Sequence, residues 1–207
     1  MKIISHRGCW NSPSEKNTYQ AFRASFDAGF GTELDVRDSN GTLLISHDMP
    51  SGNEMKFSDL LDLMDGRNLL LAINIKADGL ALDILNLLDK YSHTNYFTFD
   101  MSIPDLFFQY STGINCYCGI SDICPTPPLF PTYNGIWLDS FHSQWYSRRD
   151  LDSIVEKYKR VCIVSEDLHR RDTKKQWELV RSLDNFHSSD LVLCTDKPKE
   201  ASDFFAI

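Results

Sequence analysis

The sequence lacks the features of a membrane-spanning or multidomain protein. No apolar run approaches the ~18 residues needed to cross a bilayer. The first residues also lack a basic stretch followed by a long apolar stretch. No low-complexity segment or linker divides the 207 residues. We therefore expect a cytoplasmic protein with no stable membrane insertion, folded as one domain over residues 1–207.

Cysteine pairs with the spacing of a zinc site are also missing. The six cysteines are scattered, and Cys162 and Cys194 lie inside the apolar runs VCIV and LVLC. These thiols are expected to be reduced and buried as small hydrophobic groups.

An excess of positive charge is missing as well. The chain has 21 Lys and Arg against 29 Asp and Glu, which gives a formal net charge of -8. This balance argues against nucleic acid and anionic membranes as general partners. An anionic small-molecule substrate would need a local cluster of cations or a metal ion.

Strand-like and helix-like segments alternate along the chain, which predicts parallel strands joined by helical crossovers. An Asn40-Gly41 turn also predicts an extra hairpin strand at 42–48. The segment 125–131 is too rich in proline for a helix. Eight strands predict a closed (β/α)8 TIM barrel, with an open doubly wound sheet as the alternative. The eight strands are expected at 2–6, 32–37, 69–76, 96–100, 115–119, 136–140, 161–166 and 191–196.

Several of these strands turn polar where they end. In a (β/α)8 barrel the carboxyl ends of the strands meet at one face, where active sites lie. We therefore expect a functional rim there, although any one of these residues could instead cap a helix. The polar residues at the strand ends are His6, Arg7, Glu33, Asp35, Asn74, Lys76, Asp100, Asp139, Glu166 and Asp196.

Glu33 and Asp35 are separated by one residue on a predicted strand. Their side chains should therefore point to the same face, about 6.6 Å apart along the strand. Two carboxylates this close repel unless a cation lies between them. Oxygen ligands suit Mg²⁺ or Ca²⁺, and helix caps or salt bridges are the alternative role.

Two histidines occur in similar contexts, Ser5-His6-Arg7 and Ser46-His47-Asp48. Imidazole titrates near neutral pH, so His6 and His47 form a candidate acid/base pair. Cleavage of a phosphodiester needs such a pair and positive charge on the non-bridging oxygens. Arg7, Lys76 and a metal ion would supply that charge.

A longer pattern then carries a family resemblance. The chain reads HRG at 6–8, NT at 17–18, AF at 21–22, ELDVRDSNGTLLISHD at 33–48 and INIK at 73–76. This order resembles the glycerophosphodiester phosphodiesterase family.

The resemblance implies a TIM barrel of the phosphatidylinositol phospholipase C type with a site in the first 76 residues. It implies that His6 and His47 are the acid/base pair and that Arg7 and Lys76 face the phosphate. It also implies that Glu33 and Asp35 hold the metal.

The chain departs from the family pattern at three places. Asn74 occupies the position of a third acidic metal ligand, and a neutral amide still ligates through oxygen. The segment between Asp48 and the helix at Phe57 lacks the family's usual inserted subdomain. The family's glutamate normally directly precedes Asn-Thr, whereas here Lys16 separates Glu15 from Asn17. These departures resemble a compact bacterial subgroup associated with cell-surface polysaccharide genes. Glycerophosphodiesters, lysophospholipids and phosphodiester-linked glycan precursors all remain candidate substrates.

The second half offers candidates for substrate binding. Trp137, Asp139 and Trp145 form a candidate sugar-binding wall, with core packing as the alternative for Trp137. Glu166 begins a polar segment, EDLHRRD, which predicts either a second anion site or a solvated loop. Three histidines have no such context and are expected at the surface: His93, His142 and His187.

The sequence therefore predicts a metal-dependent phosphodiesterase acting on a small-molecule phosphodiester. One rival is transfer or cyclisation at the same site, which would release a cyclic phosphate. Another is a non-catalytic binding module for phosphorylated sugars, in which Asn74 marks lost metal binding. A monomer and a dimer are both compatible with the sequence.

Overall fold

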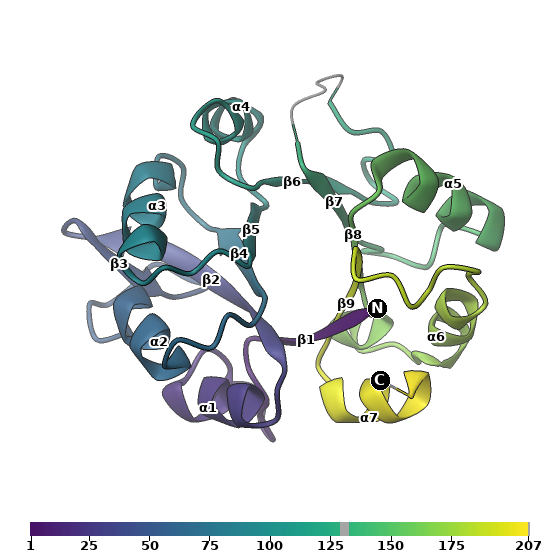
Figure 1. Ribbon diagram of the computed structural model, residues 1–207, viewed down its shortest axis with the longest axis horizontal. Coiled ribbons are helices and arrows are strands. Elements are labelled where there is room, and N and C mark those ends of the chain that lie inside the picture. The colour runs from purple at the N-terminus through teal and green to yellow at the C-terminus, as the bar shows by residue number, and fades with distance from the viewer. Residues whose placement is uncertain (129–132, 207) are drawn as a thin grey trace.

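The computed structural model describes residues 1–128 and 133–206, in which eight parallel strands form a nearly closed barrel with helices around it (Figure 1). The strands are β1 (Lys2–His6), β2 (Gly31–Ser39), β3 (Thr42–Ile45), β4 (Leu71–Ile75), β5 (Tyr96–Phe99), β6 (Tyr117–Ile120), β7 (Gly135–Leu138), β8 (Val161–Val164) and β9 (Leu191–Thr195). The helices are α1 (Tyr19–Asp27), α2 (Phe57–Met64), α3 (Ala81–Lys90), α4 (Ile103–Ser111), α5 (Arg148–Tyr158), α6 (Lys174–Arg181) and α7 (Pro198–Phe205), with short 3-10 turns at η1 (Pro13–Glu15) and η2 (Glu166–His169). This arrangement confirms the predicted (β/α)8 barrel.

The strands follow the order β5-β4-β2-β1-β9-β8-β7-β6 around the barrel, and β3 pairs with β2 outside this path. Between β5 and β6 the barrel closes through an isolated bridge, Thr98 to Cys116, where Thr98 N donates to Asn115 O at 2.8 Å. The β2–β3 hairpin turns at Asn40 and Gly41, both with positive φ, as its sequence predicts.

Two layers of apolar side chains hold the barrel together. Between strands and helices lies a large core that includes Phe22, Leu34 and Leu60. Inside the barrel, Trp137 stacks on Phe99 with ring centroids 3.8 Å apart. The alternation of strand side chains thus sends one set outward to the helices and the other set inward. The inner set also contains Ile4, Leu70, Ala72, Phe97, Tyr117, Cys162, Val164, Val192 and Cys194.

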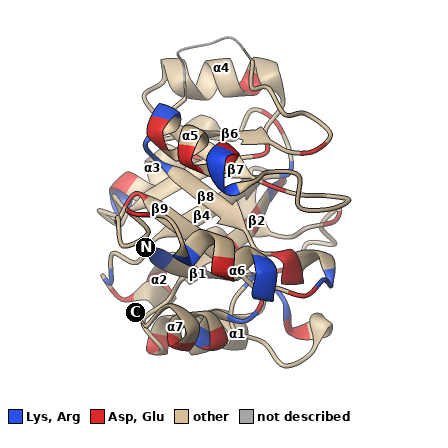
Figure 2. Ribbon diagram, turned by 90° about the vertical axis from the view of Figure 1, so that its right-hand side faces the viewer, with Lys and Arg blue, Asp and Glu red and all other residues tan. Residues whose placement is uncertain are grey.

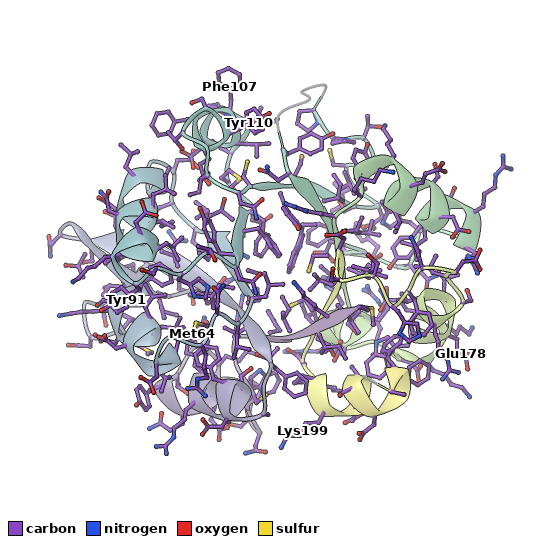
Figure 3. All side chains as sticks on the ribbon, in the orientation of Figure 1. Met64, Tyr91, Phe107, Tyr110, Glu178 and Lys199 are labelled. Carbon is purple, nitrogen blue, oxygen red and sulfur yellow. The ribbon has the colours of Figure 1, made fainter. Side chains whose placement is uncertain are left out.

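The outer sides of the helices face solvent, and that of α4 carries exposed apolar side chains, among them Phe107. Figure 3 shows Phe107, Glu178 and Lys199 on the outer side of α4, α6 and α7. Figure 2 shows Lys and Arg interspersed with Asp and Glu over the helices, without one dominant sign. In the part of the chain that the structure describes, no helix is long and apolar enough to cross a membrane.

Several strands end earlier than the sequence predicts. β3 ends at Ile45, so His47 lies in the loop after it, and β7 and β8 end before Asp139 and Glu166. At Asp139 the backbone N still donates to Ile120 O at 2.9 Å, so this residue lies directly at the end of the ladder. His93 was wrongly expected at the surface: it is buried, and its ring bonds to the Asn95 carbonyl.

Two further sequence predictions concern Trp137 and the segment 125–131. Trp137 belongs to the inner core, which is the core-packing alternative. The irregular connection predicted at 125–131 falls partly on residues 129–132, which lie outside the described residues.

Candidate active site

A tight turn after β1 aims Arg7 toward the neighbouring strand β2 at the barrel mouth. Arg7 and Gly8 both have positive φ, 61° and 87°, and Arg7 N donates to Glu33 O at 3.0 Å. A Cβ on Gly8 would lie 2.5 Å from the backbone carbon of Ala21, so α1 approaches too closely for any side chain. The His-Arg-Gly sequence therefore forms a strained turn that holds Arg7 against β2.

Asp35 is the centre of a buried charge cluster. Its side chain is inaccessible to solvent, and the Arg7 Nε atom lies 2.7 Å from Oδ2. Asn17 Nδ2 donates to the same oxygen at 2.8 Å, and Lys76 Nζ lies 3.5 Å from Oδ1. Lys76 also lies 3.7 Å from a carboxylate oxygen of Asp100. Two cations and one amide thus converge on Asp35.

Glu33 lies beside this cluster, on the same inward face of β2. Burial, and next the charge of Asp35, raise the pKa of Glu33 well above its ordinary value, against the opposing effects of Arg7, Lys76 and the Asn74 amide. Glu33 Oε2 and Asn74 Oδ1 are buried and accept no hydrogen bond from the described residues. Among the described residues, Glu33 Oε2 has only long ion-pair contacts, with His6 Nε2 at 3.8 Å and Arg7 Nε at 4.0 Å. Two buried oxygens without a hydrogen bond in this part of the chain, on the adjacent strands β2 and β4, favour a cation between them.

His6 is fixed by the last strand of the barrel. Its Nδ1 lies 2.6 Å from Asp196 Oδ1, and its Nε2 lies 3.8 Å from Glu33 Oε2. Burial lowers the pKa of His6, and the hydrogen bond with Asp196 opposes this shift. A neutral imidazole whose Nδ1 donates to Asp196 leaves Nε2 as an acceptor beside the carboxylates. Lys16 Nζ lies 3.7 Å from the other Asp196 oxygen.

His47 is placed differently from His6. It lies in the loop after β3, its side chain is half exposed, and its Nδ1 lies 2.9 Å from Asp48 Oδ1. A pocket of about 670 Å³ is lined by His47 together with Arg7, Lys16 and other residues. Among the described residues, no hydrogen bond or ion pair joins the two histidines, so their pairing stays a prediction.

The far side of the mouth holds Asp139 and Glu166. His169 Nε2 lies 2.7 Å from Asp139 Oδ1. Glu166 pairs with Arg171 through Oε2, while its Oε1 is buried without a partner. Arg171 also donates to backbone carbonyls, including Phe141 O at 3.0 Å. Because Arg171 is already bonded, it does not add a free cation for a second anion.

Sequence reasoning missed three partners in this site. Asn17 was part of the Asn-Thr motif, but nothing in the sequence shows that its amide bonds to Asp35 across the turn. Asp196 was recognised at a strand end, yet only the closing of the barrel brings β9 beside β1 and His6. The pairing of His169 with Asp139 depends on the path of η2, which no sequence signal predicted.

The candidate metal ligands are Glu33, Asp35 and Asn74. Within residues 1–128 and 133–206, no group of three or more His, Cys, Asp or Glu side chains is arranged to hold a metal ion. Glu33 and Asp35 instead stand beside the amide oxygen of Asn74, and register pairs Asp35 with Asn74 on adjacent strands. The oxygen-only donor set, with Glu33 Oε2 and Asn74 Oδ1 buried and without a hydrogen bond from the described residues, fits a hard divalent cation.

Comparisons with known proteins support the fold. No family model and no curated protein sequence matches the chain. A glycerophosphodiester phosphodiesterase from Agrobacterium tumefaciens has a similar structure, with a TM-score of 0.68, 19% identity, and coverage of 99% of this chain and 97% of that chain. A phosphodiesterase from Oleispira antarctica, solved with the product sn-glycerol-3-phosphate, gives a TM-score of 0.70, 14% identity, and coverage of 100% and 97%.

A third similar structure belongs to a different enzyme group. The Ca²⁺-dependent phosphatidylinositol-specific phospholipase C from Streptomyces antibioticus gives a TM-score of 0.60, 12% identity, and coverage of 99% and 95%. Together the three structures confirm the predicted (β/α)8 barrel fold.

Proposed function

We propose that this protein is a metal-dependent phosphoric diester hydrolase with its active site at the barrel mouth. The observation that carries the proposal is the convergence of Arg7 and Lys76 on Asp35. Beside them lie a buried Glu33 oxygen that accepts no hydrogen bond from the described residues and the His6–Asp196 pair. An acid/base group, two cations and a candidate metal site next to one another are the parts that phosphodiester cleavage needs. The fold shared with known phosphodiesterases supports the same reading.

Glu33, Asp35 and Asn74 would hold the metal ion, which we propose is Mg²⁺ or Ca²⁺. When bound, such an ion supplies positive charge to a phosphoryl oxygen. It would also relieve the repulsion between Glu33 and Asp35, which is one cause of the raised pKa of Glu33. The proposed need for a metal thus rests on two carboxylates that are buried side by side.

The other side chains at the barrel mouth have separate proposed roles. Arg7 and Lys76 would neutralise the non-bridging oxygens of the phosphate, since both are held within 3.5 Å of the same carboxylate. His6 exchanges a proton through Nε2, with Nδ1 held by Asp196. His47, in the pocket that Arg7 also lines, is the proposed second proton-transfer group. Asp139 and Glu166 would contact the rest of the substrate.

The substrate is proposed to be a small phosphodiester of the glycerophosphodiester type, or a phosphodiester-linked glycan or lipid precursor. One structural neighbour holds sn-glycerol-3-phosphate as its product, which supports the first of these. The attacking group is either water or a neighbouring hydroxyl of the substrate.

A ³¹P NMR time course with glycerophosphocholine and Mg²⁺ or Ca²⁺ tests this proposal. Hydrolysis gives a glycerol phosphate monoester signal, whereas cyclisation gives a five-membered cyclic phosphate signal. An unchanged spectrum, repeated with the other candidate diesters, would contradict the phosphodiesterase assignment.

One observation favours a second candidate, a non-catalytic module that binds phosphorylated sugars. Asp35 is already neutralised by Arg7 and Lys76 and accepts a hydrogen bond from Asn17, and Asn74 contributes no charge. If the main proposal is correct, calorimetry will detect divalent metal binding, and Asn74→Glu will tighten it about tenfold because a ligand charge is added. A binding module would show no metal binding and would bind sugar phosphate equally well in EDTA.

A further inference from the structure

We propose that Asp139 and His169, with the ring of Phe141, form a subsite for the hydroxyl groups of a polyol. The ligand class is a glycerol or sugar unit attached to the phosphate. This inference rests on the proposed function, because it names what binds beside the phosphate in the same barrel mouth.

Asp139 faces the same space as the carboxylates of β2. It follows β7, which lies four strands away from β2 in the eight-strand ring and therefore across the barrel. Trp137 on β7 points into the barrel and Leu138 points outward to the helices, so the next side chain, Asp139, points inward again. Asp139 therefore lies opposite the proposed phosphate site.

One oxygen of Asp139 is saturated and the other is available. Oδ1 accepts a hydrogen bond from Ser140 N at 2.7 Å and pairs with His169 Nε2 at 2.7 Å. Oδ2 accepts none from the described residues, and it is not among their buried unpartnered atoms. A fixed carboxylate with a free, accessible oxygen is a strong acceptor for a hydroxyl donor.

An aromatic ring lies beside this pair. Phe141 is 49% exposed, and its ring meets that of His169 edge-on with centroids 5.7 Å apart. His169 keeps 22% of its side chain accessible, so a ligand reaches both residues. A carboxylate, an imidazole and an exposed ring offer hydrogen bonds and an apolar surface together, which suits the alternating O–H and C–H groups of a polyol.

The segment that carries these groups is held in place from three sides. Asp122 accepts hydrogen bonds from Phe141 N at 2.7 Å and His142 N at 3.0 Å. Trp145 Nε1 donates to Asp139 O at 2.7 Å, and Arg171 donates to the carbonyls of Ser140 and Phe141. The subsite is therefore pre-organised, which lowers the entropic cost of binding.

The test is calorimetric binding of two phosphate monoesters, sn-glycerol-3-phosphate and methyl phosphate, which differ in the diol. The wild-type protein should prefer the glycerol ester by about tenfold, the effect of one hydrogen bond to a charged group. Asp139→Asn and His169→Gln should abolish this preference while methyl phosphate binds as before. His142→Gln is the matched control, because His142 pairs with Asp122 on the same segment but is 79% exposed.

Two outcomes would overturn the subsite: a wild-type protein that does not discriminate between the esters, or variants that keep the preference. Circular dichroism spectra and melting temperatures show whether each variant folds. Because binding is measured without turnover, an inactive protein that still prefers the glycerol ester would refute the hydrolase and retain the subsite. An active hydrolase that lacks the preference would support the hydrolase and refute the subsite.

Discussion

At the scale of single residues, the site depends on buried charges that oppose one another. Glu33 is surrounded by protein, and its folded-state pKa is raised above the ordinary 4.5 by burial and by Asp35. The folded protein therefore holds this proton at pH values where the unfolded chain releases it. The stabilisation that this bound proton gives the folded state is fully present below pH 4.5. It is lost as pH rises through the folded-state pKa of Glu33.

Glu33→Gln should accordingly be more stable than the wild type at pH 8 in EDTA, by about 1 kcal/mol or more, because it removes a buried charge. Its free energy of unfolding should also depend less on pH above 4.5. Urea unfolding between pH 5 and 8 measures both effects. Equal slopes for the two proteins would contradict the burial argument.

Glu54 provides the control of opposite sign. Hydrogen bonds from the Ser51 backbone first, with further donors at Ser51 and Gly52, lower the pKa of this exposed carboxyl to about 2. The contribution of Glu54 to the free energy of unfolding is present above pH 4.5 and is lost as pH falls toward the folded-state pKa. Glu54→Gln should therefore leave the slope between pH 5 and 8 unchanged.

At the scale of elements, the turn between β1 and α1 positions the site. Gly8→Ala should destabilise the fold by about 3 kcal/mol, because it combines a left-handed backbone with a clash against Ala21. It should also lower diesterase activity by displacing Arg7. Gly29→Ala is the control: its φ is +81°, but no atom lies within 4 Å of the new Cβ. We expect a loss of about 1 kcal/mol there, and equal losses in urea melts would refute the close approach.

The elements themselves were largely predictable from sequence. The alternation of strand-like and helix-like segments predicted the barrel, and the Asn40-Gly41 turn predicted the hairpin that pairs β2 with β3. Strand ends were less predictable: His47 pairs with the neighbouring Asp48 and Glu166 with Arg171, so both lie in loops just after their strands. The pairing of His6 with Asp196 needs the closed ring, since 190 residues separate them.

At the scale of the whole molecule, the barrel is weakest at one seam. Neighbouring strands elsewhere are joined by three to five register pairs, whereas β5 and β6 share an isolated bridge. Hydrogen exchange should therefore be faster in residues 96–99 and 117–120 than in 31–36 and 191–195. Mass spectrometry of exchanged peptides measures this, and uniform protection around the ring would show that the seam is not a local opening.

The central claim concerns the chemistry of the mouth, and one assay tests it most directly. Hydrolysis of bis(p-nitrophenyl) phosphate and glycerophosphocholine is measured with Mg²⁺, Ca²⁺, Mn²⁺ or EDTA, for the wild type, His6→Ala and the control His93→Gln. We predict turnover that requires a divalent metal, falls at least about 100-fold in His6→Ala, and persists in His93→Gln. Turnover that survives both EDTA and His6→Ala, or no turnover of either diester with any metal, would contradict the account.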